Sequence, residues 1–168
     1  TLFGRQRSGG RSNSMNMLFD SHAHYDHEKF DPDRDSLLAG LPKAGVGGVL
    51  NAASTVETSR TALLLAERYP FVWASAGVHP HDADSLDDAA LLAIEEMCRR
   101  PKVVALGEIG LDYYYDFSPR ETQRAAFARQ LELAKALDMP VIVHSREAAA
   151  DTLELMRRYR PRGVVHCF

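Results

Sequence analysis

The sequence holds few of the residues that mark a disulfide scaffold or a membrane protein. Only two of its 168 residues are cysteines, Cys98 and Cys167, and they do not form a C-x-x-C pair. A disulfide framework or zinc ribbon is therefore not expected, and both cysteines are predicted to be small buried hydrophobic residues of a cytoplasmic protein. No apolar run approaches the ~18 residues that a membrane span needs.

Positive charge is not in excess either. Lys and Arg number 20 against 23 for Asp and Glu, so the formal net charge is -3 at pH 7. This balance argues against a protein that coats nucleic acid. It does not argue against a nuclease, because bound divalent cations can supply the positive charge that phosphates need. The length and composition are those of one globular domain.

The first 14 residues differ from the rest of the chain. They read TLFGRQRSGGRSNS, which is rich in Arg, Gly and Ser and has no periodic apolar pattern. They also lack the apolar stretch that a signal peptide requires. We expect residues 1–14 to be a flexible leader or an expression remnant, with a transit peptide as the alternative. Residues 15–168 are expected to form the domain, with Met15 or Met17 as the natural start.

Short apolar runs alternate with helical patterns through the rest of the chain. The predicted strands are 17–20, 47–51, 71–77, 103–107, 141–144 and 163–166. The predicted helices begin near Asp31, Thr55, Leu86, Ser118 and Glu147, with Asp31 and Thr55 as caps. The clearest helix carries Phe127, Leu131 and Ala134 on one apolar stripe.

The predicted strands are continuous apolar runs, which indicates a parallel sheet buried on both faces. Two α/β architectures share this pattern, an open doubly wound sheet and a (β/α)8 barrel of the TIM type. No Gly-rich phosphate fingerprint follows the first strand, which weakens the nucleotide-binding open sheet and any nicotinamide or flavin oxidoreductase. Polar residues end many of the strands, where barrel enzymes carry their chemistry, so the barrel is favoured.

Six of the seven histidines lie at the ends of predicted strands. His22 and His24 are two residues apart on an extended segment, so their side chains point to one face and can bind one ion. Such a pair alone is more typical of a polar loop. However, His144 and His166 end other strands in the same register, and in a closed barrel all four rings would converge at one mouth.

Glu108 is the carboxylate expected at the centre of this cluster. Two divalent ions held by imidazoles alone would repel each other, and a bridging carboxylate offsets that repulsion. The alternative is a helix cap or a salt-bridged surface residue. A mixed histidine and carboxylate set suits Zn, Mn, Fe or Mg.

Five ordered segments resemble the signature blocks of the TatD family, which lies within the amidohydrolase-like metallo-barrels. They are FDSHAHYD (19–26), GVHPH (77–81), GEIGLDYY (107–114), PVIVHSREA (140–148) and VVHCF (164–168). The resemblance implies a metal-dependent hydrolase, most often a deoxyribonuclease with 3′-5′ exonuclease activity on DNA. It also implies two divalent ions (Zn, Mg or Mn), one on His22 and His24 and the other on His144 and His166, with Glu108 as the bridging catalytic carboxylate.

Three further residues are expected to contact the substrate. His79 faces the same mouth and could bind the scissile phosphate, and the Arg146 guanidinium could fork onto a phosphate. Asp112 is placed with them, although it could instead support the metals or shape a loop. An ordered loop histidine and a rim salt bridge are the alternatives for His79 and Arg146. Residues 113–115, three tyrosines, could stack nucleobases or pack beneath a loop.

The sequence departs from the family pattern at its end. A complete barrel needs eight strands and about 250 residues, whereas six strands are predicted here. The aspartate that the family takes from strand eight, the usual proton acceptor from the attacking water, has no match. We therefore expect a C-terminally truncated barrel with open sheet edges that favour self-association, and weak or no nuclease activity of this chain alone.

Two other functions stay open. The chain could belong to another metallo-hydrolase of the same superfamily, such as a lactonase, phosphotriesterase, amidohydrolase or D-aminoacyl-tRNA deacylase, because function depends on loops grafted onto the fold. A carboxylated lysine on the fourth strand would favour the phosphotriesterase branch, whereas Glu108 favours TatD. The chain could also be an inactive fragment that serves as an assembly module.

Overall fold

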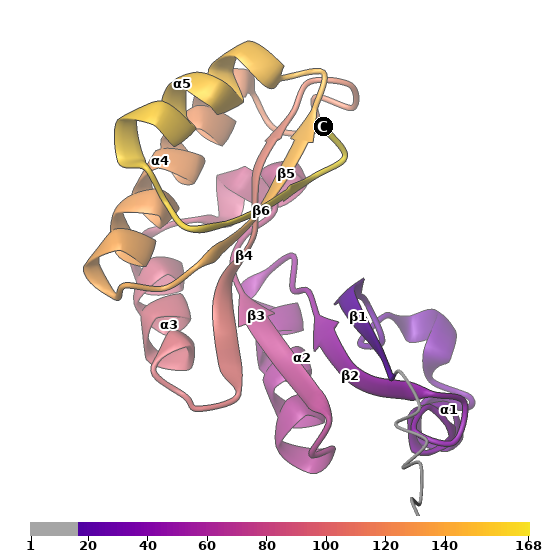
Figure 1. The fold of residues 1–168 in the computed structure, drawn as a ribbon. Coiled ribbons are helices and arrows are strands. Elements are labelled where there is room, and N and C mark those ends of the chain that lie inside the picture. The colour runs from indigo at the N-terminus through magenta and orange to yellow at the C-terminus, as the bar shows by residue number, and fades with distance from the viewer. Residues whose placement is uncertain (1–16) are drawn as a thin grey trace, which may run out of the picture.

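A computed structural model describes residues 17–168 of the protein. Its centre is one six-stranded sheet in which the strand order β1-β2-β3-β4-β5-β6 follows the chain (Figure 1). The strands are β1 (Leu18–Ala23), β2 (Val46–Asn51), β3 (Val72–Ala76), β4 (Val103–Asp112), β5 (Val141–Arg146) and β6 (Gly163–His166). Every neighbouring pair is parallel, which confirms the predicted α/β barrel-type fold with six of its strands.

Helices form the crossovers between successive strands. They are α1 (Arg34–Gly40), α2 (Val56–Arg68), α3 (Asp88–Cys98), α4 (Arg120–Ala136) and α5 (Ala149–Tyr159). Two short 3-10 helices, η1 (Glu28–Phe30) and η2 (Pro80–Ser85), follow β1 and β3. None of the helices in residues 17–168 combines the length and apolarity that crossing a membrane requires. The predicted leader, residues 1–14, lies outside the described residues.

The first turns of α1 and α2 test the two N-cap residues that the sequence predicts. Thr55 caps α2 as expected, and it forms a reciprocal capping box with Thr58. The prediction for Asp31 was wrong, because α1 begins only at Arg34 with Asp33 as its cap residue. The Asp31 carboxylate is instead used in an ion pair with the Arg34 guanidinium at 2.6 Å.

The fourth strand is longer than the sequence predicts. The apolar run ends at Gly107, but β4 continues to Asp112 and stays buried along this extension. Glu108 and Asp112 are polar, so a reading based on hydrophobicity ends the strand too early. Gly110 allows the close pairing with β5, because a Cβ atom there would lie 2.0 Å from the His144 carbonyl oxygen.

The core lies between the sheet and its helices. Phe127, Leu131 and Ala134 of α4 are all buried, as the apolar stripe predicts. Burial decreases at the two edges of the described sheet, where Leu18 of β1 is 69% exposed and Val164 of β6 is 57% exposed. Within residues 17–168, β1 pairs only with β2 and β6 only with β5.

The two cysteines differ in burial. Cys98 is buried as expected, and burial raises the pKa of its thiol to about 12. The prediction for Cys167 was wrong, because this residue is exposed. It follows β6, which within the described residues pairs only with β5 at the edge of the sheet.

The core position on α4 gives a first testable prediction. Leu131→Ala should lower the free energy of unfolding by about 2–5 kcal/mol, because it leaves a cavity at a fully buried site. Leu64→Ala on α2 is the matched control, since Leu64 is 65% exposed and the same atoms are removed. Urea unfolding followed by circular dichroism measures both, and equal losses would contradict the assigned core.

Candidate metal centre

The polar residues that end the strands line one cavity of about 670 Å³. Parallel register brings them together, because His144 of β5 lies opposite His166 of β6 and next to Gly110 of β4. His22 comes from β1, and His79 follows β3. Sequence reasoning placed these histidines at a common mouth, and the structure places them there.

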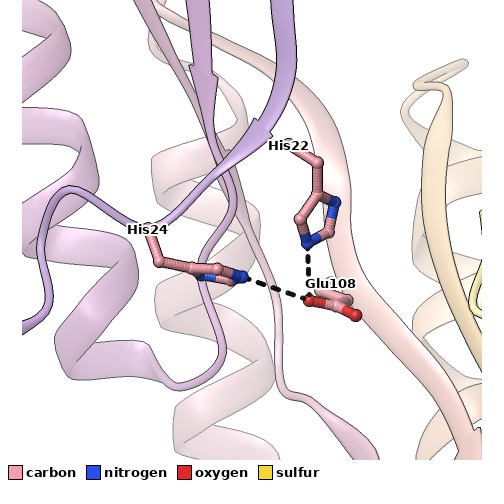
Figure 2. A group of neighbouring side chains, drawn as sticks. All are labelled: His22, His24 and Glu108. Atoms are coloured by element: carbon pink, nitrogen blue, oxygen red, sulfur yellow. Dashed lines mark ion pairs between the residues drawn. The ribbon is translucent and has the colours of Figure 1, made fainter.

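Glu108 lies at the centre of the group, and its two carboxylate oxygens face different histidines. Figure 2 shows His22 and His24 both pointing toward this side chain. The Nε2 atom of His22 lies 3.1 Å from Glu108 Oε2, and that of His24 lies 3.9 Å from the same oxygen. The first pair of histidines therefore meets one end of the carboxylate.

The second oxygen, Oε1, faces the other side of the cavity. His144 Nδ1 lies 3.0 Å from Glu108 Oε1, and His166 Nε2 contacts the same oxygen. His79 Nε2 lies 3.6 Å from it. Five imidazoles from four regions of the chain thus surround one carboxylate that is only 3% exposed.

The electrostatics of Glu108 follow from this arrangement. Burial alone would raise the pKa of its carboxyl, but hydrogen bonds with His144, His166 and His22 together hold the pKa well below its ordinary value. Glu108 is therefore ionised at neutral pH. For His144, burial lowers the pKa of the ring, yet the neighbouring Glu108 and Asp112 carboxylates raise it above its usual value.

The donor set fits divalent metal ions. Two groups, His22–His24–Glu108 and His79–Glu108–His144, each bring one ligand atom per residue within 4.8 Å of the others. Imidazole nitrogen with carboxylate oxygen is a typical ligand set for Zn and related ions. Both groups share Glu108. In the second group His79 stands where the sequence predicts His166, although His166 Nε2 also contacts Glu108 Oε1.

The His24 ring is held in a form that can bind a metal. Its Nδ1 atom lies 2.8 Å from the carbonyl oxygen of Ala52, so Nδ1 carries the proton and donates it to that oxygen. The lone pair of Nε2 is then free and faces Glu108. Ligating histidines are commonly oriented in this way by a backbone carbonyl.

The His79 ring has the opposite arrangement. Its Nδ1 atom accepts a hydrogen bond from the backbone amide of His81 at 3.2 Å, which leaves the proton on Nε2. Burial lowers the pKa of His79 to about 3, although the charge of Glu108 opposes this effect. The ring is therefore neutral, with an N–H group directed into the cavity.

Asp112 lies deeper than the sequence analysis expects of a substrate contact. It is fully buried, and its Oδ2 atom lies 3.0 Å from His144 Nε2 and 2.8 Å from His81 Nε2. Its Oδ1 atom accepts the backbone amides of Tyr114 and Tyr115, both at 3.0 Å. Burial raises the pKa of Asp112, but these bonds outweigh it and lower the pKa to about 2.

Two buried glutamines of α4 were missed by the sequence analysis. Gln123 Oε1 accepts the backbone N–H of Asp112 at 2.8 Å, and its Nε2 donates to the Asp112 carbonyl. Gln130 makes the same pair of hydrogen bonds with the backbone of Val78, the residue before His79. Its Oε1 accepts the Val78 N–H, and its Nε2 donates to the Val78 carbonyl. Both interrupt the apolar stripe of α4, and a polar residue within such a stripe is the signal that could have revealed them.

Arg146 lies at the rim of the same cavity. Its guanidinium carbon is 4.1 Å from the ring centre of Tyr114 and 4.9 Å from that of Tyr115. Within residues 17–168, Arg146 is not among the arginines that form salt bridges. Those arginines are Arg34, Arg60, Arg68, Arg99, Arg100, Arg120, Arg124, Arg129 and Arg162. The rim salt bridge that was the alternative for Arg146 is therefore not formed.

Comparison with known proteins agrees with this geometry. The chain is 41% identical over 155 residues to the 3′-5′ ssDNA/RNA exonuclease TatD of Musicola paradisiaca, with 90% of this chain and 59% of that protein covered. It is 35% identical to the uncharacterized metal-dependent hydrolase YabD of Bacillus subtilis, with 90% and 61% covered. The chain thus spans about three-fifths of the length of these relatives.

A solved structure extends the comparison to three dimensions. The TatD homolog YJJV from Escherichia coli K12 superposes with a TM-score of 0.84 at 35% identity, over 92% of this chain and 61% of that one. The family model described as TatD related DNase matches residues 19–168. Since that match takes in nearly all of the described residues, the chain belongs to the TatD family of DNases.

Proposed function

We propose that these residues form the greater part of the active site of a metal-dependent nuclease that removes nucleotides from the 3′ end of single-stranded DNA or RNA. The observation that carries this proposal is the placement of Glu108, with two histidines at one of its oxygens and three at the other. The TatD relative that carries a 3′-5′ ssDNA/RNA exonuclease name supports the substrate class.

Two divalent ions, Zn, Mg or Mn, are proposed as cofactors. His22 and His24 would hold one, His144 and His166 the other, and Glu108 would bind both. When bound, such ions lower the pKa of a water molecule and polarise a phosphoryl oxygen. The position of Glu108 supports this role, because its negative charge lies between the two pairs of histidines.

The remaining polar residues position the reacting groups. The Nε2–H of His79 would donate to a phosphate oxygen, in keeping with the hydrogen bond that fixes its tautomer. Arg146 would bind a neighbouring phosphate with its guanidinium. Asp112 would act as a positioning residue rather than a substrate contact, because it holds the ring of His144 through Nε2 and leaves Nδ1 directed at Glu108.

Some expectations stay predictions. They are the cytoplasmic location and self-association through the β1 and β6 edges. A third is that none of these residues corresponds to the family's aspartate that accepts the proton of the attacking water. Another metal-dependent hydrolase reaction would use the same ligands, so a panel of phosphodiester, lactone and amide substrates distinguishes it from nuclease activity.

Metal content tests the role of Glu108. The protein purified without chelator should contain about two equivalents of divalent metal per chain, and Glu108→Gln should remove most of it, because the amide loses the negative charge between the ions. Glu96→Gln is the control, since Glu96 is exposed on α3. Elemental analysis measures all three proteins. A folded wild-type chain without metal, or a Glu108→Gln variant with full metal, would refute the assignment.

The positioning role of Asp112 gives a separate prediction. Asp112→Asn should weaken metal binding roughly 10- to 100-fold, because the carboxylate no longer orients the His144 ring. Competition with a chromogenic chelator measures the affinity, and thermal unfolding in EDTA reports any loss of fold. The exposed Asp138→Asn serves as the control. Metal affinity equal to that of the wild type would show that Asp112 does not orient the ligand.

A further inference from the structure

The loop between β4 and α4 presents three large aromatic side chains to solvent. Tyr114 is 54% exposed, Tyr115 47% and Phe117 66%. Tyr113 differs from them, because its hydroxyl donates to Asp151 at 2.5 Å and its ring is partly buried. Large apolar groups gathered on a surface commonly mark a binding site. Packing of the loop therefore does not explain why these three rings are exposed.

The loop is ordered by hydrogen bonds to the metal centre and to α4. Asp112, which also holds His144, accepts the amides of Tyr114 and Tyr115. The Ser118 hydroxyl donates to the carbonyl of His81 at 3.1 Å, and Gln123 Nε2 donates to the carbonyl of Ser118 at 2.8 Å. The aromatic rings are thus exposed on a supported loop whose position is coupled to that of a proposed metal ligand.

The rings are already arranged as a stack. Tyr115 and Phe117 have ring centres 5.2 Å apart and planes 21° apart. His81 meets the edges of both rings, at 5.4 and 4.8 Å. Arg146 lies over Tyr115 at 4.9 Å. Phe117, the most exposed of the three aromatic rings, is therefore the member of this stack that another planar ring could extend.

The location of the stack indicates what that planar ring is. Tyr115 and Arg146 line the same cavity as Glu108 and the histidines. A phosphodiester at the proposed metal centre would have its sugar and base within reach of this rim, and Arg146 would lie beside the anionic backbone. Stacking of bases on aromatic rings beside a basic group is the usual way in which proteins bind unpaired nucleotides of any sequence.

We infer that Tyr115 and Phe117, together with Arg146, form a subsite for the 3′-terminal nucleobase, beside the scissile phosphate of a single-stranded nucleic acid. This inference rests on the proposed function, because it assumes that the phosphodiester binds at the metal centre. It adds a reason for the proposed preference for single strands, since an unpaired base is free to stack on protein side chains. It also assigns the aromatic residues to binding rather than to the chemical step.

Binding of a fluorescent oligothymidylate to the metal-loaded full chain tests the subsite. The oligonucleotide carries phosphorothioate linkages to slow cleavage, and a second version lacks the base at its 3′-terminal nucleotide. Phe117→Ala and Tyr115→Ala should each weaken binding of the complete oligonucleotide about 5- to 150-fold. They should change binding of the abasic version little, and Phe117→Trp should retain the wild-type affinity.

Tyr159→Ala is the control for loss of an aromatic ring, because Tyr159 ends α5 and bonds Glu132. If both alanine variants bind the complete oligonucleotide as the wild type does, or lose equal affinity for both oligonucleotides, the subsite is overturned while the nuclease proposal stands. If the wild-type protein binds neither oligonucleotide, the proposed function fails and the subsite fails with it.

Discussion

The contact between the Glu108 carboxylate and the histidines around it is the interaction on which the account of this site depends. A buried carboxylate is costly unless charges or hydrogen-bond donors compensate it. Here His22 and His24 face one oxygen, and His144 and His166 face the other. The same arrangement prepares the group for cations, because ligand atoms from distant parts of the chain already converge on one negative charge.

The sheet makes this convergence possible. All neighbouring strands are parallel, so every strand delivers its C-terminal end to one rim. The register between β5 and β6 then sets His144 beside His166. Supporting contacts from Asp112, at the end of β4, and from the two glutamines of α4 fix the segments from which the functional side chains extend. The proposed metal centre and the aromatic loop share Asp112, which contacts both the His144 ring and the backbone amides of Tyr114 and Tyr115.

Much of this was predictable from the sequence. Apolar runs identified all six strands, and the histidines at their ends identified the mouth of the barrel, because both depend on local patterns. The bounds of β4 were not predictable in this way, since buried polar residues such as Glu108 break the apolar pattern. The role of Gln130 was not predictable from local patterns either, because it acts through the backbone of Val78, 52 residues away in the chain. The prediction that Cys167 is buried was wrong, because the burial of this residue depends on which elements pack against β6.

Anomalous diffraction from crystals of the zinc-loaded protein tests whether Glu108 joins two metal sites. Two zinc peaks are expected about 3.5–4 Å apart, each about 2.0–2.2 Å from a different oxygen of Glu108. His22 and His24 should bind one peak, and His144 and His166 the other. A single peak bound to only one oxygen of Glu108, or zinc that does not contact this residue, would contradict the claim that Glu108 joins two metal sites.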